Sequence, residues 1–400
     1  MKKIIKREHL YGAVLLIVGI VFALVLSEFG TRVYFSIKSE KNKYYVWPPN
    51  LRKVFKPTPG TMPGVNSIAH FNVNSDGIRG DEMSSKKQHR ILAIGGSTTE
   101  CLFLDQEKSW PYALQSRLNA LHPADVWVGN AGKAGLSTRE HFMHMKYLLP
   151  QFPEVETVII LAGVNDLIRR LIEDKKYDPY FLDHYESWKQ RLIKGAFSET
   201  PYYKGKYRFR SGYYDELAIV SLVKQSLDMY SKREMIQDEA GNMFVNLRNL
   251  RKEAVQIVED LPDLTSGLEE YKRNINAIID IAQSRSVRII FMTQPSLWKK
   301  DMTSEEKNLL WYGWIESFKT KKYYSETALM RGMQAYNETL LQVCRTRNIE
   351  CIDLATMLPK NTSIFYDDAH FTDKGSLLLA EAVGNYFKKH PLHNEIRQQQ

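Results

Sequence analysis

Cysteine is scarce in this chain of 400 residues, which has only Cys101, Cys344 and Cys351. Three cysteines are too few to form the disulfide framework that holds many small secreted domains together. Cys344 is expected at a helix end and Cys351 in the strand that follows, close enough to pair if the protein is exported. Two buried free thiols are the alternative, so the number of cysteines does not identify the redox compartment.

The sequence also lacks internal repeats and any recognisable nucleic-acid-binding module. Its formal charge of +9 would suit an acidic partner, but the basic residues are scattered along the chain. No nucleic-acid partner is therefore predicted. With 44% hydrophobic and 25% charged residues, the composition excludes a disordered or fibrous protein and predicts a sizeable buried core.

One long apolar run stands out near the N-terminus, from Leu10 to Ser27, behind a basic tip that contains Lys2, Lys3, Lys6 and Arg7. At about 1.5 Å per residue this run just crosses the hydrocarbon core of a bilayer. A cleaved signal peptide would have a shorter apolar region and a small-x-small site after it, which the sequence lacks here. Residues 1–28 are therefore predicted to be an uncleaved single-pass anchor. Further basic residues at 32, 38, 41 and 43 weaken the charge asymmetry, and we predict the N-terminus inside and the body outside the membrane, periplasmic or otherwise extracytoplasmic.

Residues 29–89 are rich in Lys, Pro, Gly and Asn, and Pro48-Pro49 and Pro57-Thr58-Pro59-Gly60 are expected to break any regular element. This segment is predicted to be a stalk, or a stretch that wraps around the body. Residues 90–388 form the predicted catalytic domain, and residues 389–400 a disordered tail.

Short apolar runs alternate with helix-length segments in the predicted domain, which indicates a parallel sheet covered by helices on both faces. The five expected strands are 90–94, 126–128, 157–161, 287–291 and 349–352. Crossover helices are expected near 110–121, 271–284, 325–345 and 374–387. The predicted fold class is therefore α/β.

Two insertions interrupt this alternation, at about 170–265 and 297–325, and both are rich in aromatic residues. The first contains Pro201-Tyr202-Tyr203 and Gly212-Tyr213-Tyr214, and the second contains Trp311-Tyr312-Gly313-Trp314. Insertions after strands fall on the side of an open sheet where ligands bind, so either could form a lid or wall for a substrate. Alternatively, the aromatic residues fill a small core of their own.

Four short clusters sit where predicted strands end, the edge at which open α/β sheets bind ligands. The first is Gly95-Gly96-Ser97, which opens a helix. A serine on such a turn has the positive end of a helix dipole behind it and could be a nucleophile. The alternative is a capping box, because Ser97-x-x-Glu100 has that pattern.

The cluster Asp367-Asp368-Ala369-His370 supplies the base that a serine nucleophile needs, together with a group that orients this base. Asp367 lies three residues before His370, and Thr372 is expected to open the next helix. Asp368 is the competing partner, and the spacing favours Asp367. Alone, an Asp-x-x-His sequence is more often a surface turn.

The two remaining clusters could supply hydrogen-bond donors for a developing oxyanion. Gly135 ends the run from Asn130 and can present a backbone N–H closely, whereas Asn165, in Gly163-Val164-Asn165-Asp166, offers a side-chain amide. Each would otherwise be an ordinary turn residue. His141 and His144 have a helical spacing, but no carboxylate or cysteine cluster accompanies them, so no metal site is predicted.

Taken together, these blocks closely resemble those of the SGNH hydrolases, the GDSL-type esterases. That family carries Ser, Gly, Asn and His in four blocks, matched here by Ser97, Gly135, Asn165 and His370. Residues 74–80 (NSDGIRG) and Ser109-Trp110-Pro111 resemble features of the bacterial membrane-anchored members. Where the family's name motif has Asp before the serine, this chain has Gly96.

The resemblance implies a three-layer αβα flavodoxin-like fold and an acyl-enzyme mechanism without a metal or organic cofactor. It implies that Ser97 is the nucleophile, His370 the base and Asp367 its orienter. Ser97, Gly135 and Asn165 would form the oxyanion hole. We expect an esterase that acts on an acyl ester such as an O-acetyl group of a cell-envelope glycan. The alternatives are an O-acyltransferase that uses the same serine, and a noncatalytic glycan-binding or envelope assembly protein.

Overall fold

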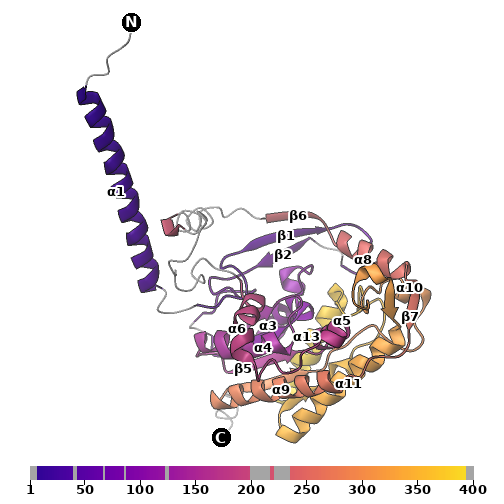
Figure 1. Ribbon diagram of the computed structural model, residues 1–400. Coiled ribbons are helices and arrows are strands. Elements are labelled where there is room, and N and C mark those ends of the chain that lie inside the picture. Colours follow the sequence, from indigo (N-terminus) through magenta and orange to yellow (C-terminus); the bar gives the residue numbers. More distant parts are fainter. Residues whose placement is uncertain are drawn as a thin grey trace, which may run out of the picture. The chain divides into compact units, whose positions relative to one another are not determined.

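The computed structural model describes residues 7–38, 43–65, 68–84, 87–121, 126–198, 217–219 and 235–392 (Figure 1). The chain divides into two compact units. One contains residues 1–43 and 199–233, and the other contains residues 44–198 and 234–400. The expected tail from residue 393 and the Tyr202 and Tyr213 motifs lie outside the described residues.

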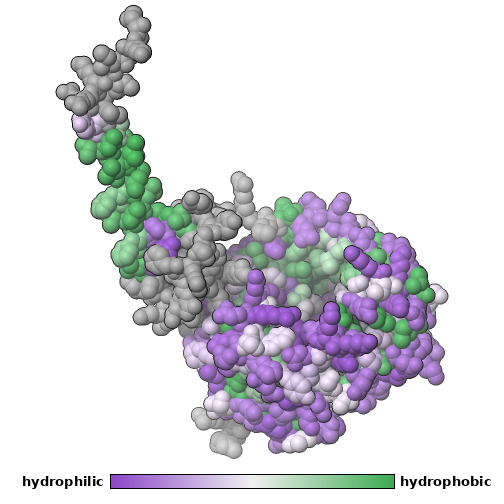
Figure 2. Space-filling view, in the orientation of Figure 1, coloured by the Kyte–Doolittle hydropathy of each residue, from purple (hydrophilic) through white to green (hydrophobic). Residues whose placement is uncertain are grey.

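The first unit contains helix α1 (Arg7–Lys38), which continues past the predicted end of the anchor at residue 28. Its stretch Tyr11–Tyr34 is long and apolar enough to cross a membrane, and none of its most apolar window is buried within the protein. Figure 2 shows this helix as a continuous column of hydrophobic residues, unlike the mostly hydrophilic surface of the second unit. Helix α1 is therefore a candidate membrane span.

The core of the second unit is a five-stranded parallel sheet. Its strands are β3 (His89–Gly95), β4 (Val126–Gly132), β5 (Thr157–Leu161), β8 (Arg288–Met292) and β10 (Glu350–Ile352). The spatial order is β10-β8-β5-β3-β4, which is the flavodoxin-like order 2-1-3-4-5 when these strands are numbered along the chain. The predicted strands and fold class are confirmed. The prediction succeeded because strands that are buried on both faces are almost continuous apolar runs in the sequence.

Helices cover both faces of this sheet. Helix α3 (Trp110–Leu121) packs against α13 (Asp373–Lys389), and α9 (Thr265–Ser284) packs against α11 (Glu326–Arg347). On α9 the buried residues include Tyr271, Ile275, Ile278, Ile279 and Ala282, the spacing of a single helical face. The remaining helices of the domain core are α2 (Ser97–Glu100), α4 (Thr138–Met143), α5 (Val164–Glu173) and α12 (Leu354–Met357), with a π-helical turn at His144–Leu148 and 3₁₀ turns at Gln106–Lys108, Leu149–Gln151 and Asp174–Lys176.

The proline-rich segment before the domain contains regular structure where none was expected. Strand β1 (Arg52–Pro57) pairs antiparallel with β2 (Ala69–Asn72) and parallel with β6 (Met235–Ala240). Arg79 exchanges backbone hydrogen bonds with Asn130 at the edge of the main sheet, which agrees with the wrapping alternative. The sequence-based expectation failed because the prolines lie at or beyond the ends of β1, where no ladder hydrogen bond needs their missing N–H.

Both insertions contain regular elements, and they are joined to each other. The first includes α6 (Tyr185–Ala196), α8 (Asn242–Lys252) and β7 (Gln256–Val258), and the second includes α10 (Ser304–Lys307), a 3₁₀ turn at Phe318–Thr320 and β9 (Lys322–Tyr324). Strand β7 pairs in parallel with β9. Arg251 of α8 also donates to the backbone carbonyls of Tyr312 and Tyr324. The two insertions therefore form a joint structure.

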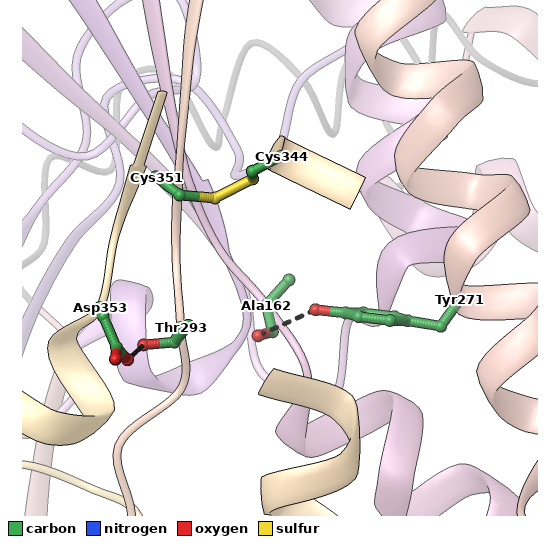
Figure 3. The surroundings of a disulfide bond; sticks show 6 residues. All are labelled: Ala162, Tyr271, Thr293, Cys344, Cys351 and Asp353. Atoms are coloured by element: carbon green, nitrogen blue, oxygen red, sulfur yellow. Dashed lines mark hydrogen bonds between the residues drawn. A yellow bond between two sulfur atoms is a disulfide. The ribbon is translucent and has the colours of Figure 1, made fainter. Parts of the chain in front are cut away.

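Cys344 at the end of α11 and Cys351 in β10 form a disulfide, with a Cα–Cα distance of 6.2 Å (Figure 3). Of the two alternatives that the sequence left open, the structure contains the pair. Cys101 is free and buried. In the same region the Tyr271 hydroxyl donates to the Ala162 carbonyl, and Thr293 donates to Asp353.

Candidate active site

The ends of three neighbouring strands are level with one another, and this brings three of the predicted site residues together. Gly95 of β3 is in register with Gly132 of β4 and Leu161 of β5. Ser97, Gly135 and Asn165 follow these ends by only a few residues, and all three line one cavity of about 460 Å³ together with His370. Residues from all four sequence clusters therefore lie around one cavity, although only three of these clusters directly follow a strand.

Ser97 is the first residue of α2, and Gly96 occupies the N-cap position without a side-chain cap hydrogen bond. The Ser97 hydroxyl instead lies 2.7 Å from Nε2 of His370. Glu100, the expected partner in a capping box, is buried in the wall of the cavity. The capping interpretation is therefore wrong, and the hydroxyl is oriented toward a base.

His370 and Asp367 share a tight turn that is closed by their own hydrogen bonds. Nδ1 of His370 lies 2.7 and 3.0 Å from the two carboxylate oxygens of Asp367. Asp367 Oδ1 also accepts from the backbone N–H groups of Ala369 and His370. This turn does not directly follow a strand as expected, because α12 intervenes after β10; it immediately precedes α13, which Thr372 caps through the N–H of Gly375.

Asp368 points away from His370 and binds the second insertion. Its Oδ1 accepts from the indole N–H of Trp298 at 2.8 Å. Its Oδ2 accepts from the backbone N–H groups of Trp311 at 2.7 Å and Tyr312 at 3.1 Å. The geometry thus separates the two neighbouring aspartates, with Asp367 on the imidazole and Asp368 holding a segment of chain.

Electrostatic interactions between Asp367 and His370 favour an ionised Asp367 beside the imidazole. Burial alone would raise the pKa of Asp367, but the charge of His370 and the hydrogen bonds to the carboxylate outweigh it and lower the pKa. Burial alone would lower the pKa of His370, yet Asp367 raises it above its ordinary value of 6.5. Asp367 is completely buried, so water competes little for its oxygens.

Glycine conformations position Gly135 and Asn165, the two residues expected to donate to an oxyanion. Gly135 has a φ of +77°, a left-handed conformation that side chains disfavour, in the loop after β4. The Asn165 amide donates one N–H to the carbonyl of Leu136 at 2.8 Å, which leaves the second N–H of its Nδ2 for a ligand. A Cβ on Gly96 would lie 2.4 Å from that nitrogen, so glycine is needed where the family's name motif has aspartate.

Several cavity residues were not identified as site residues from the sequence. Glu100 lies in the wall, where burial raises its pKa to about 7. The second insertion contributes Trp311, Tyr312 and Trp314, and α8 of the first contributes Met243 and Phe244. The wall predicted for the aromatic insertions is therefore present. The alternative, an aromatic core, also holds in part, because Tyr323 of the second insertion is fully buried.

His141 and His144 are both buried on the helical segment after β4. His144 Nε2 pairs with the backbone carbonyl of Ala196 at 3.1 Å. Burial lowers the pKa of His141 to about 3 and that of His144 to about 4. Within the described parts of the chain, no group of three or more His, Cys, Asp or Glu side chains is arranged to hold a metal ion.

The raised pKa of His370 predicts the pH dependence of turnover. A base must be neutral to accept the serine proton, so kcat/KM should rise with pH through the pKa of His370, with a midpoint above 6.5. Ester hydrolysis followed from pH 5 to 9 checks this. Because the Glu100 charge contributes to raising the pKa of His370, Glu100→Gln should move the midpoint to lower pH while an acid limb remains. If the acid limb of the pH profile vanished in Glu100→Gln, the titrating group would be Glu100 and not His370.

No protein-family model and no curated protein matches the chain. Among solved structures, the chain is similar to a protein described as lipolytic, of the G-D-S-L family, from Desulfitobacterium hafniense, with 13% identity over 74% of this chain and 98% of that one and a TM-score of 0.37. An acetylxylan esterase from Geobacillus stearothermophilus shows 14% identity over 78% and 98% of the two chains, with a TM-score of 0.39. The esterase EstA from Pseudoalteromonas shows 12% identity over 75% and 97%, with a TM-score of 0.36. These similarities are low, so the fold rests on the strand order and the chemistry on the geometry of the site.

Proposed function

We propose that the protein is a membrane-anchored serine esterase of the SGNH type, which hydrolyses an acyl ester through an acyl-enzyme intermediate. The observation that carries this proposal is the hydrogen-bonded chain from Ser97 through His370 to Asp367, whose serine and histidine open onto a cavity. A nucleophile, a base within hydrogen-bond reach and a group that orients the base are the requirements for covalent acyl transfer.

In this mechanism Nε2 of His370 takes the proton of Ser97 as the serine oxygen attacks the ester carbonyl carbon. The Ser97 and Gly135 backbone N–H groups and the Asn165 amide donate to the carbonyl oxygen as it becomes negative, an interaction for which each donor is worth about 2.7 to 4 kcal/mol. His370 then gives the proton to the departing alcohol. Water, activated by the same imidazole, releases the acid and restores Ser97. Asp367 stays ionised and stabilises the imidazolium.

The proposed substrate is an ester outside the cytoplasm, such as an O-acetyl group on a cell-envelope glycan. The apolar helix α1 supplies a candidate anchor. The Cys344–Cys351 disulfide suits an oxidising compartment and therefore an exported body. The cavity wall presents the rings of Trp311 and Trp314, which lie nearly parallel with centroids 6.0 Å apart, a surface on which a sugar ring can pack.

A panel of esters tests this function on the full chain in detergent. It should contain p-nitrophenyl esters from acetyl to long acyl chains, together with acetylated oligosaccharides. We expect turnover of the acetyl esters and labelling of Ser97 by a fluorophosphonate probe. Acyl transfer to an added glycan in place of hydrolysis would assign the transferase alternative. If a folded sample showed no turnover and no labelling, this result would favour the noncatalytic alternative and contradict the proposal.

A further inference from the structure

Trp311 and Tyr312, two adjacent residues of the second insertion, lie against the triad. The indole N–H of Trp311 donates to Oδ2 of Asp367 at 3.0 Å. The ring of Tyr312 lies near that of His370, with ring centroids 6.3 Å apart. The hydrogen-bonded chain therefore runs through four residues, Trp311, Asp367, His370 and Ser97, and it begins in the insertion.

This dipeptide is held from both sides by buried groups. Asp368 Oδ2 accepts hydrogen bonds from the backbone N–H groups of Trp311 and Tyr312, and Arg251 donates to the carbonyl of Tyr312. Arg248, also on α8, donates to the carbonyls of Leu309 at 3.2 Å and Tyr366 at 2.7 Å, and so ties the insertion to the turn that carries His370. A wall that only shaped the cavity would not need its backbone fixed to the residue next to the catalytic aspartate.

We propose that Trp311 is a positioning residue of the active site, whose indole N–H orients the carboxylate of Asp367. This inference rests on the proposed esterase function and adds one residue to the hydrogen-bonded chain of its triad.

Trp311 acts on Asp367 by occupying one of its oxygens. Oδ2 of Asp367 faces both Nδ1 of His370 and the indole N–H, so the indole fixes the carboxylate plane against the imidazole. Its donation also spreads part of the negative charge of the carboxylate. Without it, the carboxylate would attract the imidazolium more strongly and would be less firmly oriented.

Trp311→Phe tests the positioning role, because it keeps an aromatic wall and removes the N–H. We expect kcat for p-nitrophenyl acetate to fall about 10-fold, as for one lost hydrogen bond to a charged group, with KM changed less than about twofold. β-(3-Benzothienyl)alanine at position 311 keeps the bicyclic shape and should behave in the same way, which guards against a packing defect in Trp311→Phe.

A second measurement does not depend on turnover. In the inactive Ser97→Ala background, titration of the His370 ring by NMR should give a higher pKa when Trp311→Phe is added. A purely structural role for the indole would leave this titration unmoved. If the wild type proves to hydrolyse no ester, the proposed function fails, while this titration still decides whether Trp311 acts on the pair.

Tyr323→Phe is the control, because Tyr323 is a buried aromatic residue of the same insertion whose hydroxyl finds no hydrogen-bond partner among the described residues. It should retain wild-type kcat and an unchanged His370 titration. A Trp311→Phe variant with unchanged kcat and unchanged His370 titration would overturn the proposal.

Discussion

Replacing Ser97 with alanine should lower kcat for ester hydrolysis by about 10⁴- to 10⁶-fold, because no other group can form the acyl-enzyme. The Ser97 hydroxyl is hydrogen-bonded to His370, and α2 uses no side-chain cap. The fold should therefore tolerate the change, and the thermal midpoint should stay near that of the wild type. Steady-state kinetics on p-nitrophenyl acetate, with the full chain in detergent, measure the loss.

Ser116→Ala is the matched control for this variant. Ser116 lies exposed on α3, and its hydroxyl donates within the helix to the carbonyl of Tyr112. Its removal should leave kcat and fluorophosphonate labelling unchanged. If Ser97→Ala retained more than a few per cent of wild-type turnover in a preparation free of other esterases, Ser97 would not be the nucleophile.

Asp367→Asn and Asp368→Asn should differ in their effects on kcat and on stability, because the two neighbouring carboxylates have different roles. Asparagine at 367 cannot stabilise the imidazolium and favours the wrong tautomer of His370, so kcat near neutral pH should fall about 10⁴-fold. Asparagine at 368 removes an oxygen that accepts two backbone N–H groups. The free energy of unfolding should then fall by about 1 to 3 kcal/mol, with a loss of kcat at least about 100-fold smaller than in Asp367→Asn.

Kinetics and urea unfolding of both variants check these expectations side by side. The informative comparison is the ratio of the two losses in kcat at a temperature where both proteins are folded. Equal losses would mean that the orienting role is shared, which the distances do not predict. A larger loss in Asp368→Asn would show that the assignment from the hydrogen bonds is reversed.

The amino-acid sequence predicted the five-stranded sheet well, because the strands of this sheet are buried on both faces and are therefore continuous apolar runs. The expected strand at 157–161 is β5, and the expected helix at 110–121 is α3. It could not predict the sheet of β1, β2 and β6, since β1 pairs with β6, which lies far along the chain within the first insertion. Local composition carries little information about such pairing.

The site was predictable where a residue type and a strand end coincide, as at Ser97, Gly135 and Asn165. The choice between Asp367 and Asp368 depended on spacing alone, and only the direction of each carboxylate separates them. Nothing in the local sequence indicated that Trp311 reaches the triad. Its position depends on Asp368, which accepts from its backbone N–H, and on Arg251, which holds the next residue and lies 60 residues before Trp311 in the chain.

The bond between Asp368 and the 311–312 backbone constrains how this protein can evolve. Exchanging the whole insertion for one from an enzyme with another substrate would also remove the indole on Asp367. Recombination of that kind should therefore give progeny with lowered activity. New preferences are more readily acquired by single replacements at Trp314 or at Phe318, whose ring centroid lies 4.3 Å from that of Trp314, because neither ring belongs to the hydrogen-bonded chain through the triad.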